Sequence, residues 1–163
     1  MTLYTIGYEG IDINGFLSLL HRHAVQTVVD VREMPISRKP GFSKKILSDT
    51  LDVSGLQYVH IPKLGCPKAI RNRYRDDGNW TQYTASFLKY LDMQHETLAE
   101  LASMAGKSNC ALMCFEADFN RCHRSMVADA VKQLNGIQVV HIQRAELNAA
   151  TSASLELEFA QEG

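Results

Sequence analysis

The chain has 163 residues, a length that fits one domain and is too short for two domains with large separate cores. Apolar residues make up 45% of it and charged residues 21%, which excludes a chain that is disordered by composition. No apolar run approaches the roughly 18 residues of a membrane span, and the N-terminus lacks the features of a signal peptide. Four cysteines without such a signal favour reduced thiols. We therefore expect a cytoplasmic protein with no membrane partner.

The net charge of −1 conceals a basic region. Residues 30–75 hold ten Lys and Arg against four Asp and Glu, while the rest of the chain holds seven against fourteen. Such a region favours an anionic partner, either a small phosphorylated molecule or nucleic acid. Solvated loop charges would give the same count, so both interpretations stay open.

Local patterns in the first half of the chain predict three strands and two helices. Continuous β-branched or apolar runs indicate strands, and apolar residues at helical spacing indicate helices. In chain order we expect a strand over 3–6, a helix from about 12 to 20, a strand over 26–31, a loop over 32–42, a helix over 43–51 and a strand over 57–61. Residues 63–79 are expected to form a long loop, and loops of this length tend to be functional or mobile.

The second half continues the alternation of helices and strands. We expect a helix over about 81–105 with a kink near His95, a strand over 109–115, a helix over 123–134 and a strand over 137–142. Residues 1–145 are predicted to form a single domain, and residues 146–163 a C-terminal tail or frayed helix.

This alternation predicts an α/β domain. The strands read as apolar on both faces, which is typical of a parallel sheet covered by helices. We expect a single three-layer open sheet of about five mostly parallel strands, with helices on both faces. The favoured strand order is 3-2-1-4-5, ahead of 2-1-3-4-5.

Polar residues cluster directly after the predicted strands. Because the carboxyl ends of parallel strands share one edge of an open sheet, we expect these side chains to form a common ligand site. The catalytic candidates are Asp30, His60, Glu116 and Cys122. The candidates for anion binding are Tyr8, Arg32, Ser37, Arg38, His123, Arg124 and Ser125.

The run Cys122-His123-Arg124-Ser125 opens a predicted helix. A cysteine at a helix N-terminus gains reactivity because the helix dipole and cationic neighbours favour its thiolate. The same turn offers backbone N–H groups and Arg124 to a phosphate or carboxylate. Cys122 is therefore a candidate nucleophile, and the alternative is a capping turn around a small buried cysteine.

Two further patterns allow a functional and a structural interpretation. Asp30 and Arg32 lie on the same side of a strand end. They could bracket a substrate, with Asp30 as base or ribose acceptor, or they could form an internal ion pair that holds the loop. His60 ends a strand and could act in acid–base chemistry or as a structural histidine.

A metal site is a weaker interpretation of the same region. Cys114, Glu116, Cys122 and His123 carry groups that suit zinc, and Cys66 could add another ligand. Their spacing is not that of a standard zinc finger. We assign no metal ligand and no cofactor from the sequence.

Aromatic and basic residues also interleave in the long predicted loop and just beyond it. This mixture could serve base stacking and phosphate contact. Asp76 and Asp77 in the same stretch weaken that interpretation. The aromatic residues are Tyr74, Trp80 and Tyr83, and the basic ones are Lys68, Arg71, Arg73 and Arg75.

Several of these residues together carry a family resemblance. The first block is Thr5-Ile6-Gly7-Tyr8, and the second is Asp30-Val31-Arg32 with Pro35, Ser37, Arg38, Gly41 and Phe42. The later blocks are Tyr58, His60, Pro62, Leu64 and Gly65, and then Cys114, Glu116 and Cys122-His123-Arg124. In this order, over about residues 3–142, the chain resembles the family known as domain of unknown function 488. The resemblance implies a compact α/β domain with a shared polar pocket, and it brings no established reaction.

The leading hypothesis is a small cytoplasmic enzyme or enzyme-like domain with an anionic substrate: a phosphorylated molecule, a nucleotide or nucleic acid. Arginines at the carboxyl edge of the sheet would hold phosphate, and carboxylate or imidazole groups would supply acid–base function. The second hypothesis is a non-catalytic nucleic-acid or nucleotide-binding module. The third is a metal or thiol-redox protein. The sequence leaves open whether the chain is an enzyme.

Overall fold

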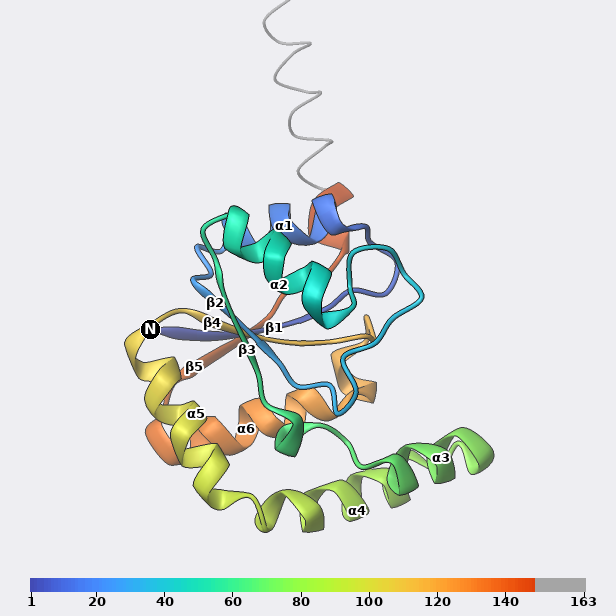
Figure 1. The fold of residues 1–163 in the computed structure, drawn as a ribbon. Coiled ribbons are helices and arrows are strands. Elements are labelled where there is room, and N and C mark those ends of the chain that lie inside the picture. The colour runs from blue at the N-terminus through green and yellow to red at the C-terminus, as the bar shows by residue number, and fades with distance from the viewer. Residues whose placement is uncertain (149–163) are drawn as a thin grey trace, which may run out of the picture.

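A computed structural model describes residues 1–148 as one three-layer α/β domain, which confirms the predicted fold class (Figure 1). Its five strands all run parallel in one sheet, in the order β3-β2-β4-β1-β5. The strands are β1 Thr2–Gly7, β2 Thr27–Asp30, β3 Gln57–His60, β4 Cys110–Cys114 and β5 Gln138–His141.

The expected strand order is wrong, because β4 lies between β2 and β1. Cys110 is in register with Thr27 of β2 on one side and with Leu3 of β1 on the other. Every residue of β4 and β2 is buried, whereas the edge strands β3 and β5 are partly exposed. Local patterns identify a buried strand, but pairing depends on contacts between distant residues, which those patterns do not encode.

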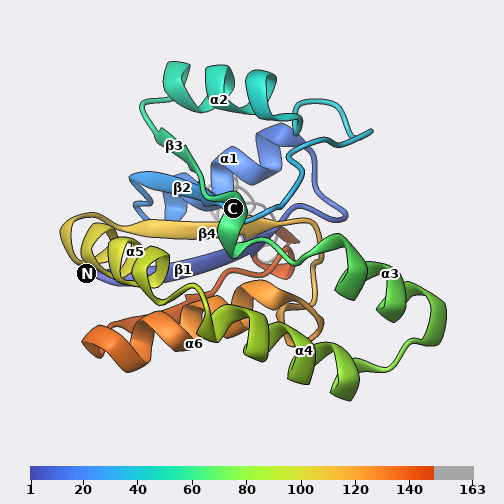
Figure 2. The same ribbon diagram turned by 60° about the horizontal axis from the view of Figure 1, so that its bottom comes forward.

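Two helices cover one face of the sheet, α1 Ile13–Arg22 and α2 Lys44–Val53 (Figures 1 and 2). Asp12 caps α1 by accepting a hydrogen bond from the backbone N–H of Gly15 at 2.8 Å. Both helices bury an apolar stripe against the sheet, including Phe16 of α1 and Leu47 of α2.

The other face is covered by α4 Trp80–Asp92, α5 His95–Lys107 and α6 His123–Asn135 (Figure 2). Their apolar residues form a second core with the opposite face of the sheet, with Phe87, Leu101 and Val127 at its centre. Gly136 ends α6 in the left-handed region at φ 71°, which favours glycine.

The segment between β3 and β4 differs most from expectation. The predicted loop over 63–79 contains a 3₁₀ turn, Pro62–Leu64, and a helix, α3 Lys68–Asp77. Helix α3 has no fully buried residue, and its short apolar face consists of Ile70 and Tyr74, which pack against the core from a mainly charged sequence. The predicted helix over 81–105 is divided into α4 and α5 at Met93 and Gln94. Figure 1 shows α3 and α4 side by side, extending beyond the sheet.

The C-terminal prediction lies mostly outside the described residues. Residues 145–148 are helical, and residues 149–163 of the expected tail are not described. Within residues 1–148, no helix is long and apolar enough to cross a membrane.

Candidate functional site

A cavity of about 600 Å³ lies at the carboxyl edge of the sheet, where β2 and β4 end side by side. After β2 the chain turns to α2 on one face, and after β4 it turns to α6 on the other (Figure 2). Ligands of open α/β sheets bind at such a divergence of connections. The cavity is lined by Tyr8, Arg32, Glu33, Met34, Ile36, Ser37, Arg38, Cys66, Arg71, Tyr74, Arg75, Tyr83, Cys114, Phe115, Glu116, Arg121 and His123.

The end of β2 holds a buried ion pair. Arg32 Nε and Nη2 donate to the two carboxylate oxygens of Asp30 at 2.9 and 2.7 Å. The Tyr58 hydroxyl donates to the same carboxylate at 2.5 Å, and Arg32 Nη1 donates to the Phe42 carbonyl at 2.7 Å. Burial alone would lower the pKa of Arg32, but the Asp30 carboxylate outweighs it and raises that pKa. The structure thus shows the internal ion pair that the sequence left as an alternative.

The loop after β2 is fastened to the loop after β1. Tyr8 stacks on Phe42 with ring centroids 4.4 Å apart, and its hydroxyl accepts a hydrogen bond from Arg32 Nη1 at 3.2 Å. Lys39 Nζ donates to the Tyr8 carbonyl at 2.8 Å. These contacts hold one wall of the cavity in place, with Arg38 and Ser37 on it.

Two glycines allow close backbone contacts beside the cavity. A Cβ on Gly7 would overlap the Glu116 carbonyl, so the loops after β1 and β4 can approach only because position 7 lacks a side chain. A Cβ on Gly65 would likewise overlap the backbone of Glu33. Cys66, next to Gly65, is buried in the cavity wall, and burial raises the pKa of its thiol to about 11.

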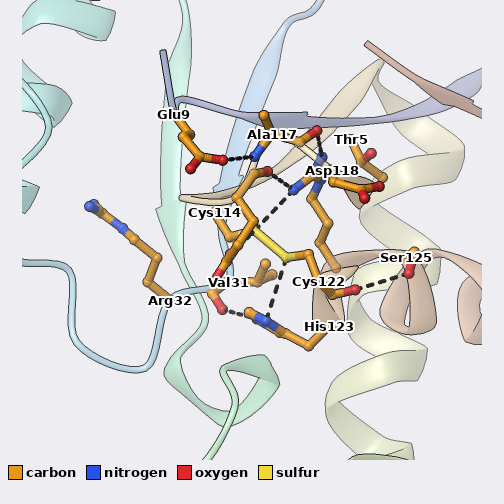
Figure 3. The surroundings of a disulfide bond; sticks show 12 residues. Thr5, Glu9, Val31, Arg32, Cys114, Ala117, Asp118, Cys122, His123 and Ser125 are labelled. Carbon is orange, nitrogen blue, oxygen red and sulfur yellow. Dashed lines mark hydrogen bonds between the residues drawn. A yellow bond between two sulfur atoms is a disulfide. The ribbon is translucent and has the colours of Figure 1, made fainter. Parts of the chain in front are cut away.

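The end of β4 and the start of α6 bring two cysteines together beside a buried arginine, and Figure 3 shows the two cysteines facing each other. Cys114 and Cys122 form a disulfide, with Cα atoms 7.9 Å apart, so the expectation of reduced thiols is wrong for this pair. Cys66 and Cys110 are free thiols. Arg124 is fully buried, and its Nη1 donates to the Glu116 carbonyl and to Cys114 Sγ, the latter at 3.3 Å. Burial lowers the pKa of Arg124 to about 10. Its Nε is the one buried side-chain nitrogen or oxygen of residues 1–148 without a hydrogen-bond partner.

His123 and Glu116 face the cavity from the same region. His123 Nε2 lies 2.7 Å from the Val31 carbonyl, and burial lowers the pKa of this histidine to about 4. The ring is therefore neutral at physiological pH. Glu116 Oε2 lies 3.4 Å from Cys114 Sγ, and partial removal of its carboxyl from water raises the pKa of Glu116. Such a carboxyl is suited to proton transfer.

The charges on the cavity wall are mainly positive, with five arginines against two glutamates. Arg71 pairs with Glu33 at 2.8 Å, and Arg32 pairs with Asp30. Within residues 1–148, no carboxylate lies within salt-bridge distance of Arg38 or Arg121. The Arg121 guanidinium lies 5.9 Å from the centre of the Trp80 ring. Two cationic groups on the wall thus remain available to an anion.

The structure brings together part of the residue set expected from the sequence. Six of those residues line the cavity, namely Tyr8, Arg32, Ser37, Arg38, Glu116 and His123. The other five, Asp30, His60, Cys122, Arg124 and Ser125, are placed behind or beside its wall, outside the lining set.

The five residues that do not line the cavity use their polar atoms in bonds to other parts of the protein. His60 Nε2 lies 2.7 Å from the Arg32 carbonyl, and Ser125 Oγ donates to the Cys122 carbonyl at 2.9 Å. Cys122 is buried and bonded to Cys114. Asp30 and Arg124 are fully buried. Both bond to other parts of the protein, and neither faces the cavity directly.

Sequence reasoning did not assign the apolar part of the wall. Met34, Ile36 and Phe115 line the cavity and are 55%, 69% and 45% exposed. A usable signal was present, since large apolar side chains in polar loops directly after strands are candidates for ligand contact. Cys114, Cys122 and His123 form the one group in residues 1–148 that could hold a metal ion.

Comparison with known proteins gives one match. The family model described as "Domain of unknown function DUF488" matches residues 12–131, which is most of the chain. No curated protein matches the chain. No solved structure matches it either.

Proposed function

The chain belongs to the DUF488 family, and because that description names no activity, we propose a function from the cavity itself. The chain is an enzyme-like domain that binds a small anionic molecule with an apolar or aromatic part, such as a nucleotide, at the carboxyl edge of its sheet. The observation that carries this proposal is a pair of arginines, Arg38 and Arg121, on the wall of a cavity of about 600 Å³, neither of which has a carboxylate partner within residues 1–148.

Each part of the wall supports one part of such a ligand. Arg38 and Arg121 supply charged donors for a phosphate or carboxylate. Phe115, with Met34 and Ile36, supplies apolar surface for a ring. The volume falls in the range of roughly 300–1,000 Å³ that is common for small-molecule sites. Glu116 is the acid–base group of this proposal, because it faces the same space.

The basic residues of α3 support the nucleic-acid alternative less well. Arg71 is paired with Glu33, and Arg73 lies 3.7 Å from Asp77 on its own helix. These pairs reduce the positive charge that the helix presents to a phosphate backbone. Anion binding is therefore assigned to the cavity and not to the outer surface of α3.

The test is calorimetric titration with AMP, ATP and inorganic phosphate, with adenosine as the neutral comparison. Wild-type protein should bind a phosphorylated probe more tightly than adenosine. Arg38→Ala and Arg121→Ala should each weaken that binding by roughly 10-fold or more, because a charged hydrogen bond contributes about 1.5–3 kcal/mol.

Arg73→Ala is the matched control, because Arg73 is an exposed arginine outside the cavity lining. Its affinity for the probes should equal that of the wild type. Equal weakening by Arg73→Ala, or no binding of any phosphorylated probe, would contradict the proposal. Binding of short RNA that falls steeply with salt and is lost when Lys68 and Arg73, which lie outside the cavity lining, are replaced would favour the nucleic-acid module.

A further inference from the structure

Three potential metal ligands converge between the end of β4 and the start of α6. One ligand atom each from Cys114, Cys122 and His123 can be chosen so that all three lie within 4.8 Å of one another. All three residues are buried. Figure 3 shows them next to one another. This cluster is separate from the arginines that carry the proposed function, although Cys114 and His123 also face the cavity.

The histidine is held in the orientation and tautomer of a metal ligand. Its Nε2 lies 2.7 Å from the Val31 carbonyl, which can only accept, so Nε2 carries the proton of the neutral ring. The lone pair is then on Nδ1, which lies 3.8 Å from Cys122 Sγ. Ligating histidines characteristically donate their other N–H to a carbonyl or carboxylate in this way.

The backbone spacing of the two cysteines suits a shared ion. Their Cα atoms are 7.9 Å apart, beyond the roughly 4.4–6.8 Å of ordinary protein disulfides. Two sulfurs that share a tetrahedral zinc ion lie about 3.8 Å apart, given Zn–S bonds of about 2.3 Å. Reduced thiols separated by an ion therefore fit this spacing better than a direct bond does.

A buried guanidinium lies on one side of Cys114 Sγ, and the cavity lies on another. Arg124 Nη1 donates to Cys114 Sγ at 3.3 Å from a fully buried position, and a guanidinium there stabilises a negative sulfur. On the cavity side, Glu116 Oε2 lies 3.4 Å from the same sulfur. A carboxylate oxygen or a water molecule can complete a tetrahedral set at this point.

We propose that the reduced chain binds one Zn²⁺ through Cys114, Cys122 and His123, with the fourth position open to the cavity. The disulfide is the metal-free, oxidised state of the same two thiols. Reduction by a phosphine adds two electrons to the sulfur–sulfur bond. Water supplies the two thiol protons and the oxygen of the phosphine oxide. Both thiols lose their protons when the ion binds.

The experiment is anaerobic titration of the phosphine-reduced, metal-free full chain with Co²⁺, followed by displacement with Zn²⁺. Wild-type protein should develop thiolate-to-cobalt charge-transfer absorption and the strong visible bands of a tetrahedral ion, saturating at one equivalent. Zn²⁺ should then abolish both. A reduced wild-type chain that shows neither band overturns the proposal.

Substitutions identify the ligands. His123→Ala, Cys114→Ser and Cys122→Ser should each weaken Co²⁺ binding by more than roughly 100-fold, beyond the effect of losing an outer partner. Cys110→Ser is the matched control, because Cys110 is a buried thiol on the same strand outside the cluster. Equal weakening by the control, or full affinity in a folded Cys122→Ser chain, would contradict the assignment.

Cysteine alkylation of the wild-type chain tests the proposal without any variant, and therefore also if a variant does not fold. Bound Zn²⁺ should protect Cys114 and Cys122 from alkylation, as read by peptide mass spectrometry, and chelation should remove that protection. Unprotected thiols in the presence of Zn²⁺ would overturn the proposal. Anion binding is measured separately on the oxidised, metal-free chain, so a failure of one proposal is distinguished from a failure of the other.

Discussion

The ends of β2 and β4 lie side by side and are built in opposite ways. At the end of β2, Arg32 donates two hydrogen bonds to the Asp30 carboxylate. The Tyr58 hydroxyl also donates to this carboxylate, and Arg32 also donates to the Phe42 carbonyl. Beside the end of β4, by contrast, Arg124 of α6 is buried, and among the described residues its hydrogen bonds include no carboxylate and its Nε has no partner. A buried arginine is therefore paired with a carboxylate at the end of one strand, and only partly hydrogen-bonded beside the end of the next.

This difference indicates which strand end contributes mainly to folding stability and which one is available for binding or reaction. A buried ion pair with complete hydrogen bonding fixes geometry and offers nothing to a ligand. Buried groups that lack partners in the protein are candidates for function. We therefore expect substitutions at the end of β2 to affect mainly folding, and those at the end of β4 to affect mainly reactivity and binding.

The largest expected effect is that of Arg32→Met. It leaves the fully buried Asp30 carboxylate without its cation, which should lower the free energy of unfolding by about 3–5 kcal/mol. Urea unfolding followed by circular dichroism measures this. Arg73→Met breaks the exposed pair with Asp77 and should cost less than about 0.5 kcal/mol. Equal losses for the two variants would show that the buried Asp30–Arg32 pair does not stabilise the fold more than the exposed pair does.

Gly7→Ala tests the close approach between the loops after β1 and β4. The new Cβ overlaps the Glu116 carbonyl, so the backbone must shift, at a cost of about 1–3 kcal/mol. The same urea experiment applies. Gly106→Ala is the control: it adds a Cβ within α5 in open space and should stabilise the helix by about 0.5–1 kcal/mol. Tolerance of Gly7→Ala would mean that the β4 loop is not held there.

Arg124→Met tests the difference between the two strand ends directly, because it replaces the arginine beside the end of β4 by methionine, as Arg32→Met does at the end of β2. The groups that lose their donor here are the backbone carbonyls of Glu116 and Ala117 and not a hydrogen-bonded carboxylate, so the free energy of unfolding should fall by about 1–3 kcal/mol, less than for Arg32→Met. Alkylation of Cys114 in the reduced chain should become slower, because the guanidinium that favours its thiolate is gone. A stability loss as large as that of Arg32→Met would make the two strand ends equivalent.

The smallest effect concerns Cys66, a thiol on the same cavity wall without a guanidinium bonded to its sulfur among the described residues. Burial raises its pKa to about 11, against 9.0 for an ordinary thiol. Its thiolate fraction at pH 8 should therefore be roughly 100-fold lower. Its alkylation rate should rise until about pH 11, whereas in the urea-unfolded chain it should level off near pH 9. A plateau near pH 9 in the folded chain would contradict the shift.

The same shift has a consequence for stability. The pKa of Cys66 is higher in the folded than in the unfolded chain, so this thiol contributes its full stabilisation below about pH 9. That contribution is lost as the pH rises through about 11. Cys66→Ser should remove this part of the alkaline loss of stability.

Much of the fold could be predicted from the sequence, because its strands and capped helices carry local signals. The runs before Asp30 and Glu116 read as buried strands, and Gly136 marks the end of α6. Helix α3 gave only a weak signal, since its apolar face is limited to Ile70 and Tyr74, both partly buried, in a mainly charged stretch. The position of β4 also gave none, because strand pairing is decided by contacts between residues far apart in the chain.

The sequence predicted the location of the candidate site better than the roles of its residues. Grouping the residues that follow the strands identified the edge where the cavity lies. It could not distinguish Arg38, which faces the cavity without an ion-pair partner among the described residues, from Arg124, which is buried behind it. Which side chains are buried depends on how the loops after β1 and β4 pack against each other. Gly7, where a Cβ would overlap the Glu116 carbonyl, is the one residue of the local sequence that points to this packing.

The central place of β4 also bears on how the chain is made. β1 and β2 emerge from the ribosome long before β4, and neither pairs with the other. An N-terminal fragment that ends before Cys110 therefore cannot form a continuous sheet, and its apolar strands stay exposed until β4 inserts between them. Because the cavity lies where β2 meets β4, a fragment that ends before β4 lacks the Cys114, Phe115 and Glu116 part of its wall. The nascent chain has a long interval in which chaperones can bind it.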